Sequence, residues 1–574
     1  MIEAMRMANE PQVPPHALLR PPSTVMRLAR LGAFHQTRLS FMRALLRRLK
    51  SEHWEFERPR WDISSDGVGT AVYRARGPER SYSLVCFAHD LDPALRTDRV
   101  IAEAWDATFA LYDGTPNVGE LARLKANVPL QEAGRFRASE LILSRANRSV
   151  RLFEHVAASL AAGRQPDPEK LRSVGYLMRT TAVYGNGKFG IADRDRTADR
   201  PEFAGPFQAE MLTVWLIRAF TVDIAEHLAA ARAPTTAVRL DPAMRRTLGV
   251  GNATGLGLGP FIANHPALFD RWISARETAL ARVRALEAAT PKTIAAFRDT
   301  LSRARALVAS WRVDDARQTA RIKELDADLK ALSIRVEDGA LDRSAPWDAL
   351  YDWGEDTLSL EGQEMLVGLL IEPHGALVDD LADAMAIDEA AQFRIDATQS
   401  VAALIETIQD IFGWALTIDF EAPATQARFW YVSEEKLEPR LGERMTEPGS
   451  ALEQPLTTAR DVAELHAVLK DQDPVATLAE FLLGHPEYRR TVRRVQIAMR
   501  HPYSEIHDNL LAADMVPLDL LRCKLSFFGA TRFDPKSDRW LRINMYQYAP
   551  FPDELATDEI EDWAFPPLRQ PVTV

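Results

Sequence analysis

Cysteine is almost absent from this chain of 574 residues, which contains only Cys86 and Cys523. Neither belongs to a CxxC pair or to a cluster of cysteine and histidine, so the sequence indicates neither a disulfide framework nor a thiolate zinc site. No run of about 18 apolar residues occurs, and the N-terminal residues lack the basic and then apolar pattern of a secretory signal. We therefore expect a cytoplasmic protein with no membrane partner.

An excess of positive charge is also lacking. The formal net charge is -11 and the pI is about 5.7, whereas a dedicated nucleic-acid binder needs a basic face to neutralise phosphates. We therefore expect no nucleic-acid partner. The motifs that would identify a reaction are missing as well: Gly-x-Ser-x-Gly, a phosphate loop ending in Gly-Lys-Ser/Thr, and a glycine fingerprint directly after a strand. No internal repeat of fixed period is visible, which excludes solenoids and propellers.

The composition is that of an ordinary globular protein, with 46% apolar and 26% charged residues. From about residue 138 to 384, apolar residues recur mostly at intervals of three and four, which predicts a series of helices. Shorter alternating runs lie before and after this region. We expect an α+β fold with a predominantly helical body and small antiparallel β elements toward both ends. The expected regions are 1–60 (a flexible arm and a basic amphipathic helix), 61–130 (a small antiparallel sheet), 131–385 (a helical core) and 386–574 (an α+β region ending in a hairpin).

Within these regions, local patterns predict particular elements. The first 22 residues are rich in proline and predict a loose arm, after which Ser23 or Thr24 caps a helix that runs to about Lys50. Alternating apolar residues and turn signals predict strands and hairpins, and charged amphipathic stretches predict helices. The predicted strands are 70–74, 82–87, 107–112, 412–420 and 428–432, with a C-terminal hairpin of 524–533 and 540–548. The predicted helices include a charged antiparallel pair over 291–336 and further helices between 459 and 483.

Two stretches rich in glycine and asparagine, 184–190 and 249–260, interrupt the expected helical core. Such stretches lose much conformational entropy on folding, so they are typical of tight turns and of backbone that lies against a ligand. The first follows residues 176–179, expected on a helix, and its exposed amides with nearby cations can hold a carboxylate, sulfonate or phosphate. The second precedes an expected helix whose dipole would add to the attraction. The predicted substrate-binding residues are Arg179, Tyr184, Asn186, Lys188, Asn252, Thr254 and Asn264. The alternative for the first stretch is a left-handed helix cap with surface ion pairs.

Candidate catalytic residues follow on a helix that begins near Ser359. Glu361 and Glu364 are three residues apart and therefore share one face of that helix. Together with His265, which precedes the helix expected from about residue 267, they are the predicted acid and base groups. The alternative for the two glutamates is a solvated acidic face, and for His265 a place beside a helix cap.

The densest group of potential metal ligands lies at residues 501–509. His501, Glu505 and His507 are the predicted ligands of a divalent metal, because imidazole and carboxylate together suit zinc, iron or manganese. A capped helix with polar residues in its first turn is the alternative interpretation. The cofactor is otherwise unknown from the sequence.

We therefore expect an enzyme that acts on a small anionic metabolite, with lyase or hydrolase chemistry by acid-base or metal-assisted catalysis. The first alternative is a non-catalytic helical scaffold that binds other proteins through the charged helix pair and the basic first helix. The second alternative is a cofactor-dependent oxidoreductase. The charged helix pair also suggests a homo-oligomer that forms through this pair.

Overall fold

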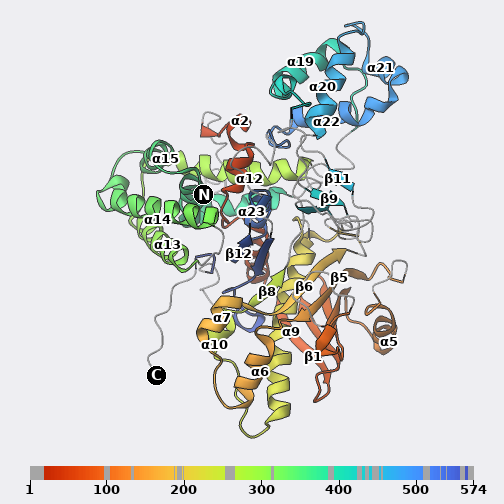
Figure 1. Ribbon diagram of the computed structural model, residues 1–574, viewed down its shortest axis with the longest axis vertical. Helices are drawn as coiled ribbons and strands as arrows, with labels where there is room; N and C mark the ends of the chain where they lie inside the picture. The colour runs from red at the N-terminus through yellow and green to blue at the C-terminus, as the bar shows by residue number, and fades with distance from the viewer. Residues whose placement is uncertain are drawn as a thin grey trace, which may run out of the picture. The chain divides into compact units, whose positions relative to one another are not determined.

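A computed structural model describes the chain as two compact units, each made of segments that are distant in sequence (Figure 1). Unit 1 comprises Met1–Leu39, Gly255–Trp311 and Ala316–Lys524, and unit 2 comprises Ser40–Thr254, Arg312–Asp315 and Leu525–Val574. The described residues are 18–95, 104–130, 135–185, 188–189, 197, 199–203, 205–252, 266–311, 316–385, 394–422, 430–432, 439–441, 451–453, 457–507, 517–529, 532–537, 540–555 and 563–565. This division cuts across the four regions expected from the sequence.

Unit 2 is built on one 10-stranded sheet. The strand order is β1-β2-β3-β4-β5-β6-β8-β13-β12, and β7 pairs with β6. The strands are β1 (Glu55–Ile63), β2 (Gly69–Arg76), β3 (Ser81–Ala88), β4 (Ala107–Asp113), β5 (Glu140–Arg148), β6 (Tyr176–Gly185), β7 (Lys188–Phe189), β8 (Gly249–Asn252), β12 (Arg532–Ser537) and β13 (Trp540–Met545). The α+β class is confirmed, but the strands are not small separate elements. The expected helical core was wrong at β5 and β6.

The predicted hairpin of 70–74 and 82–87 is confirmed as the antiparallel pair β2 and β3, and the strand expected at 107–112 is β4. Helix α9 (Gln208–Arg232) covers one face of the sheet, where Phe220 contacts Tyr73 and Phe109 edge to face. Helix α5 (Val118–Asn127) covers the other face, where Leu124 packs with Val85 and Leu143. The sheet is therefore buried on both sides along its middle strands. The other helices of unit 2 are α4 (Phe41–Ser51), α6 (Phe153–Ala161), α7 (Pro168–Val174) and α10 (Pro242–Arg246).

The C-terminal part of the chain completes this sheet. Strand β13 lies antiparallel to β8 and also pairs with β12, which confirms part of the predicted C-terminal hairpin. Residues 524–528, which we expected in a strand, instead belong to helix α23 (Pro517–Phe528). Beyond β13, the chain is held by the fully buried Arg218 of α9, which donates hydrogen bonds to the carbonyl oxygens of Ala549 and Pro550.

Unit 1 is mainly helical. Its longer helices before residue 385 are α12 (Pro266–Arg284), α13 (Pro291–Ser310), α14 (Ala316–Glu337), α15 (Pro346–Thr357) and α16 (Leu360–Ile371), with the short α17 (Gly375–Val378). The helix pair expected over 291–336 is confirmed, because α13 and α14 pack together and Arg305 donates a hydrogen bond of 3.1 Å to Ser333. Helix α16 begins where the sequence predicted, since the hydroxyl of Ser359 accepts a hydrogen bond from the amide of Gly362.

A second group of helices in unit 1 has its own apolar core. Figure 1 shows the helices of this group close together. These helices are α19 (Val401–Phe412), α20 (Thr457–Leu469), α21 (Leu478–Gly484) and α22 (Arg489–Arg500), and a small sheet of β9 (Trp430–Val432), β10 (Pro439–Leu441) and β11 (Ala451–Glu453) lies between them in sequence. Strand β9 and the helices between 459 and 483 were predicted. The strand expected at 412–420 was wrong, because Phe412 ends α19 and its side chain packs in the helical core.

The N-terminal segment is not the single long helix expected from Ser23 or Thr24 to Lys50. It forms α2 (Pro22–Val25) and α3 (Leu28–Gly32) in unit 1, and α4 begins only after Ser40. Residues 34–37 are not helical. Arg38 of this connection forms two hydrogen bonds with the carboxylate of Asp379, at 2.6 and 2.7 Å. Tertiary ion pairing therefore holds a stretch that local periodicity would have left helical.

Candidate functional site

The two glycine- and asparagine-rich stretches begin on neighbouring strands of unit 2. Strand β6 carries the start of the first stretch, and β8 carries the start of the second. The two strands are parallel, with Arg179 beside Gly251 and Thr180 beside Asn252. Because parallel strands point the same way, the chain leaves both toward the same edge of the sheet. The sequence had placed Arg179 on a helix, and this was wrong.

Two of the glycines in the second stretch have a packing role in β8. A Cβ atom on Gly249 would lie 2.5 Å from the carbonyl oxygen of Met545, and one on Gly251 would lie 2.7 Å from the ring of Tyr176. Both distances are shorter than carbon atoms tolerate, so only glycine fits between the neighbouring chains. The start of this stretch is therefore a closely packed strand rather than the open loop expected from the sequence.

Beside this point, polar side chains share one face of the sheet. Asn147 of β5 lies directly opposite Arg179 of β6, and Arg145 of β5 lies opposite Thr108 of β4. Directly opposite residues in antiparallel strands point to the same face, as do residues two apart along a strand. These four residues, Thr108, Arg145, Asn147 and Arg179, are called the arginine strip below. Arg179 is only 3% exposed, whereas Arg145 is half-buried.

Residues 104–106 hold the middle of the arginine strip. The side chain of Asn147 accepts a hydrogen bond from the amide of Asp106 and donates one to the carbonyl oxygen of Ala104. The guanidinium of Arg145 stacks over the ring of Trp105 at 3.9 Å. Stacking and hydrogen bonds of this kind restrict the rotamers of the side chains that make them.

One histidine adjoins the arginine strip. Nε2 of His89 lies 3.0 Å from the hydroxyl oxygen of Thr108. Burial lowers the pKa of His89, and the charge of Asp106 opposes this only in part. The imidazole is therefore mainly neutral at pH 7.

The structure describes only some of the other residues predicted to bind substrate or to act in catalysis. Tyr184 and Lys188 belong to β6 and β7, whose pairing joins Tyr184 to Phe189 and Gly185 to Lys188. Asn252 ends β8. Asn186, Thr254, Asn264 and His265 lie outside the described residues.

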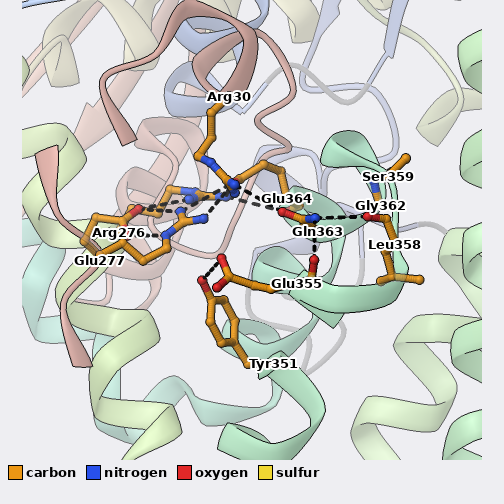
Figure 2. A network of polar contacts seen from close by, with 11 residues as sticks. Arg30, Arg276, Glu277, Tyr351, Glu355, Leu358, Ser359, Gly362, Gln363 and Glu364 are labelled. Carbon is orange, nitrogen blue, oxygen red and sulfur yellow. Dashed lines mark hydrogen bonds and ion pairs between the residues drawn. The ribbon is translucent and has the colours of Figure 1, made fainter. Parts of the chain in front are cut away.

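The two predicted catalytic glutamates belong to unit 1 and lie in ion pairs rather than on a solvated face. Glu364 is fully buried and pairs with Arg20, Arg30 and Arg276, with Arg20 at 2.5 Å and Arg30 at 2.7 Å (Figure 2). Arg20 also forms two hydrogen bonds with Glu277, at 2.7 and 2.8 Å. Arg20 lies in the segment expected to be a loose arm, but it is 4% exposed and is anchored in this network.

Glu361 lies in a neighbouring group. Its carboxylate accepts a hydrogen bond of 2.5 Å from Arg522 and lies 3.4 Å from Nε2 of His35. Burial would raise the pKa of Glu361, but Arg522 and His35 outweigh that effect and hold the pKa well below its usual range. Arg20, Arg276 and Arg30 do the same for the pKa of Glu364. Both groups are therefore ionised at neutral pH and bound to cations, an arrangement that favours a structural role over proton transfer.

The three predicted metal ligands have separate partners. Nδ1 of His501 lies 3.0 Å from a carboxylate oxygen of Asp270, Glu505 pairs with Arg494, and His507 stacks on Trp414. Within the described ranges, no group of three or more His, Cys, Asp or Glu side chains is arranged to hold a metal ion. The metal prediction therefore finds no support in this part of the chain.

Sequence reasoning missed Arg145, Asn147 and the cations that surround Glu364. Residues 141–143 of β5 form a short continuous apolar run, which fits a buried strand as well as a buried helix and therefore did not identify the strand. No local signal identifies Arg20 or Arg276, because their partners come from distant parts of the chain.

The helices in the described ranges include none that combines the length and the apolar character needed to cross a membrane. A scan against protein-family models and searches of curated proteins and of solved structures found no match to this chain.

Proposed function

We propose that unit 2 binds a small anionic molecule at the arginine strip. The observation that supports this most directly is the position of Arg145 and Arg179 on one face of adjacent strands, beside the point where the chain leaves β8. Both glycine- and asparagine-rich stretches begin on the parallel strands β6 and β8. Ligands of open sheets that contain parallel strands commonly bind outside the carboxyl ends of those strands.

The chemistry of the strip favours an anion. Guanidinium groups donate paired hydrogen bonds to carboxylate, sulfonate or phosphate, and such charge-assisted bonds are stronger where water is excluded. Arg179 is buried and Arg145 is half-buried.

An enzymatic role in the lyase or hydrolase class remains part of this proposal. The neutral imidazole of His89, which adjoins the strip in unit 2, is suited to accept a proton. Glu361 and Glu364 are less suited, because their carboxylates are already bound to arginine and histidine.

The test compares Arg179→Met with Arg76→Met. Arg76 lies on β2 of the same sheet, with its side chain 53% exposed, and serves as the matched control. We expect isothermal titration with sulfate, inorganic phosphate or succinate to show binding by the unchanged protein. Arg179→Met should weaken it about tenfold or more, because one charge-assisted pair is lost.

Arg76→Met should leave the affinity unchanged. Since Arg179 is buried, Arg145→Met provides a second variant with less risk to folding, and circular dichroism checks both. Equal affinity in all three variants would reject the arginine strip as the binding site.

A further inference from the structure

Helix α22 presents a strongly basic face in the second group of helices of unit 1. Its twelve residues include five arginines and no carboxylate. Val492 and Val495 pack into the apolar core of this group, whereas the side chains of Arg489, Arg490 and Arg493 are exposed. The apolar side of the helix is therefore already covered, and its exposed side carries mainly positive charge.

Helix α19 of the same group presents the opposite charge. The stretch 395–422, which contains this helix, has five Asp and Glu residues and neither Lys nor Arg. Glu406 and Asp410 are exposed and lie four residues apart, so they share one face of α19. Leu404 and Ile408 pack into the apolar core from the other side of the helix. The outward faces of α19 and α22 therefore carry opposite charges.

These charges are poorly compensated within the molecule. With the other residues that the structure describes, four of these side chains form no hydrogen bond or ion pair: Arg489, Arg490, Glu406 and Asp410. Like charges three or four residues apart destabilise a helix, and this applies to both faces. The two arginines also begin α22, where the helix dipole disfavours cations, and the first turn has no acidic residue. Opposite charges supplied from outside would relieve both costs.

The charge of the whole helical group favours a protein partner over a nucleic acid. Residues 394–422 and 457–507 contain 8 Arg and Lys residues against 12 Asp and Glu residues, and five of those eight cations belong to α22. A nucleic acid bound to α22 would therefore lie beside helices whose remaining charge is mainly negative, which repels phosphates. A second copy of this chain, in contrast, provides on α19 an acidic face that matches the basic face of α22.

We infer that this protein associates with itself through these two helices, so that the basic face of α22 in one copy pairs with the acidic face of α19 in another. Each copy has one face of each sign, and therefore can contribute to two contacts at once. Exposed ion pairs are individually weak and are screened by salt, so this association should be weak and sensitive to salt. The inference does not depend on the anion site proposed for unit 2.

The experiment is sedimentation velocity of the full-length protein over about a hundredfold range of protein concentration, in about 0.05 M and about 0.5 M NaCl. At the lower salt concentration, we expect the weight-average mass to rise with protein concentration. At the higher salt concentration, the association should weaken about tenfold or more, because screening removes most of the attraction between exposed charges.

Reversal of charge identifies the two faces. The α22 variant carries Arg489→Glu and Arg490→Glu, and the α19 variant carries Glu406→Lys and Asp410→Lys. Each variant alone should associate about tenfold or more weakly than the unchanged protein, because like charges then meet across the contact. An equimolar mixture of the two variants should recover the association, because each face of one variant then meets its opposite in the other.

The control carries Arg317→Glu and Lys323→Glu, which reverse two exposed cations of α14. This control changes the net charge as much as the α22 variant does, and it should leave the association unchanged. Circular dichroism checks that all three variants are folded, and the comparison of salt concentrations tests the inference without any variant.

Several results would overturn the inference. They include a protein that stays monomeric at the lower salt concentration, an association that salt does not weaken, and an association that survives in either variant. A mixture that associates no better than its components would do the same. Loss of association in the control would assign the contact to the charged pair α13 and α14. If the unchanged protein stays monomeric and the α22 variant loses binding to a DNA oligonucleotide, the basic face has a different partner.

Discussion

The two units of this protein bury arginine in different ways. Unit 1 surrounds Arg20 and Arg276 with the carboxylates of Glu277 and Glu364. Unit 2 buries Arg218 completely, and within the described residues its guanidinium donates hydrogen bonds to backbone carbonyl oxygens, including that of Leu248 at 2.6 Å. In the first case charges compensate charges, and in the second the dipoles of the backbone solvate one charge.

This difference determines which changes destabilise each unit. A carboxylate can be neutralised by a proton, so the network of unit 1 depends on pH and on the number of charges that remain. Carbonyl oxygens do not titrate in this range. The burial of Arg218 instead depends on the backbone path, because residues 248 and 549–550 must both be in place to accept its hydrogen bonds. The stability of the unit 1 network therefore depends on charge balance, whereas the stability of the Arg218 site depends on the path of the backbone.

The largest expected effect is that of Glu364→Gln in unit 1. This change keeps the shape of the side chain but leaves Arg20, Arg30 and Arg276 with one fewer buried anion. We expect unit 1 to lose about 3–5 kcal/mol of stability, the usual cost of an uncompensated buried charge. Amide hydrogen exchange in α12 and α16 measures this unit separately from the sheet of unit 2.

The control for this prediction is Asp326→Asn on α14, which removes an anion from an exposed pair with Lys330. Its effect should stay within about 0.5 kcal/mol. Similar small losses in both variants would mean that the buried network contributes no more than a surface pair, and the contrast between the units would then disappear.

Arg218→Met in unit 2 should have the next largest effect. Methionine fills much of the same space but leaves the carbonyl oxygens of Leu248, Ala549 and Pro550 without their donor. We expect a loss of about 2–3 kcal/mol, because no unpaired charge remains. Exchange should rise at β8 and β13, which these carbonyl groups adjoin in sequence.

Arg232→Met, on the same helix with its side chain 41% exposed, is the matched control. It should leave exchange in the sheet unchanged. If Arg218→Met lost more stability than Glu364→Gln, the proposed order would be reversed. That result would show that backbone acceptors bind the buried arginine more strongly than carboxylates do.

The smallest effect concerns pH. Burial lowers the pKa of His35 below 6.5 in the folded protein, so below about pH 6.5 the unfolded chain binds a proton that the folded chain does not. Stability from this group is therefore present above that pH and is lost as the pH falls. Glu361 and Glu364 act in the same direction below about pH 4.5, because their folded pKa values are depressed.

We expect exchange in α16 to rise between pH 7 and pH 5, and His35→Gln to reduce that rise. Glu361, Arg522, Arg276 and Trp311 lie around His35, and the depressed pKa of Glu361 keeps that carboxylate ionised across this range. A rise of equal size in the variant would assign the acid sensitivity of unit 1 to other residues.

Where the signal lies within a few residues, the sequence predicted the structure well. The turn between β2 and β3, the cap of α16 at Ser359 and the packed pair α13 and α14 all follow from local periodicity and capping. Strands β5 and β6 were missed because both are buried in the middle of the sheet and lack the alternation of a half-exposed strand. The candidate site was predicted only as a pair of glycine-rich stretches and Arg179.

The sequence by itself determined the class of fold, the local helices and hairpins, and the two glycine- and asparagine-rich stretches. Only the tertiary structure decided that these stretches begin on adjacent parallel strands, that Arg145 joins Arg179, and that Glu364 is buried among arginines. The physical reason is that pairing between strands and pairing between charges both depend on partners far away along the chain. Local patterns report how a segment can fold, whereas the free energy of burying a charge depends on which distant residue meets it.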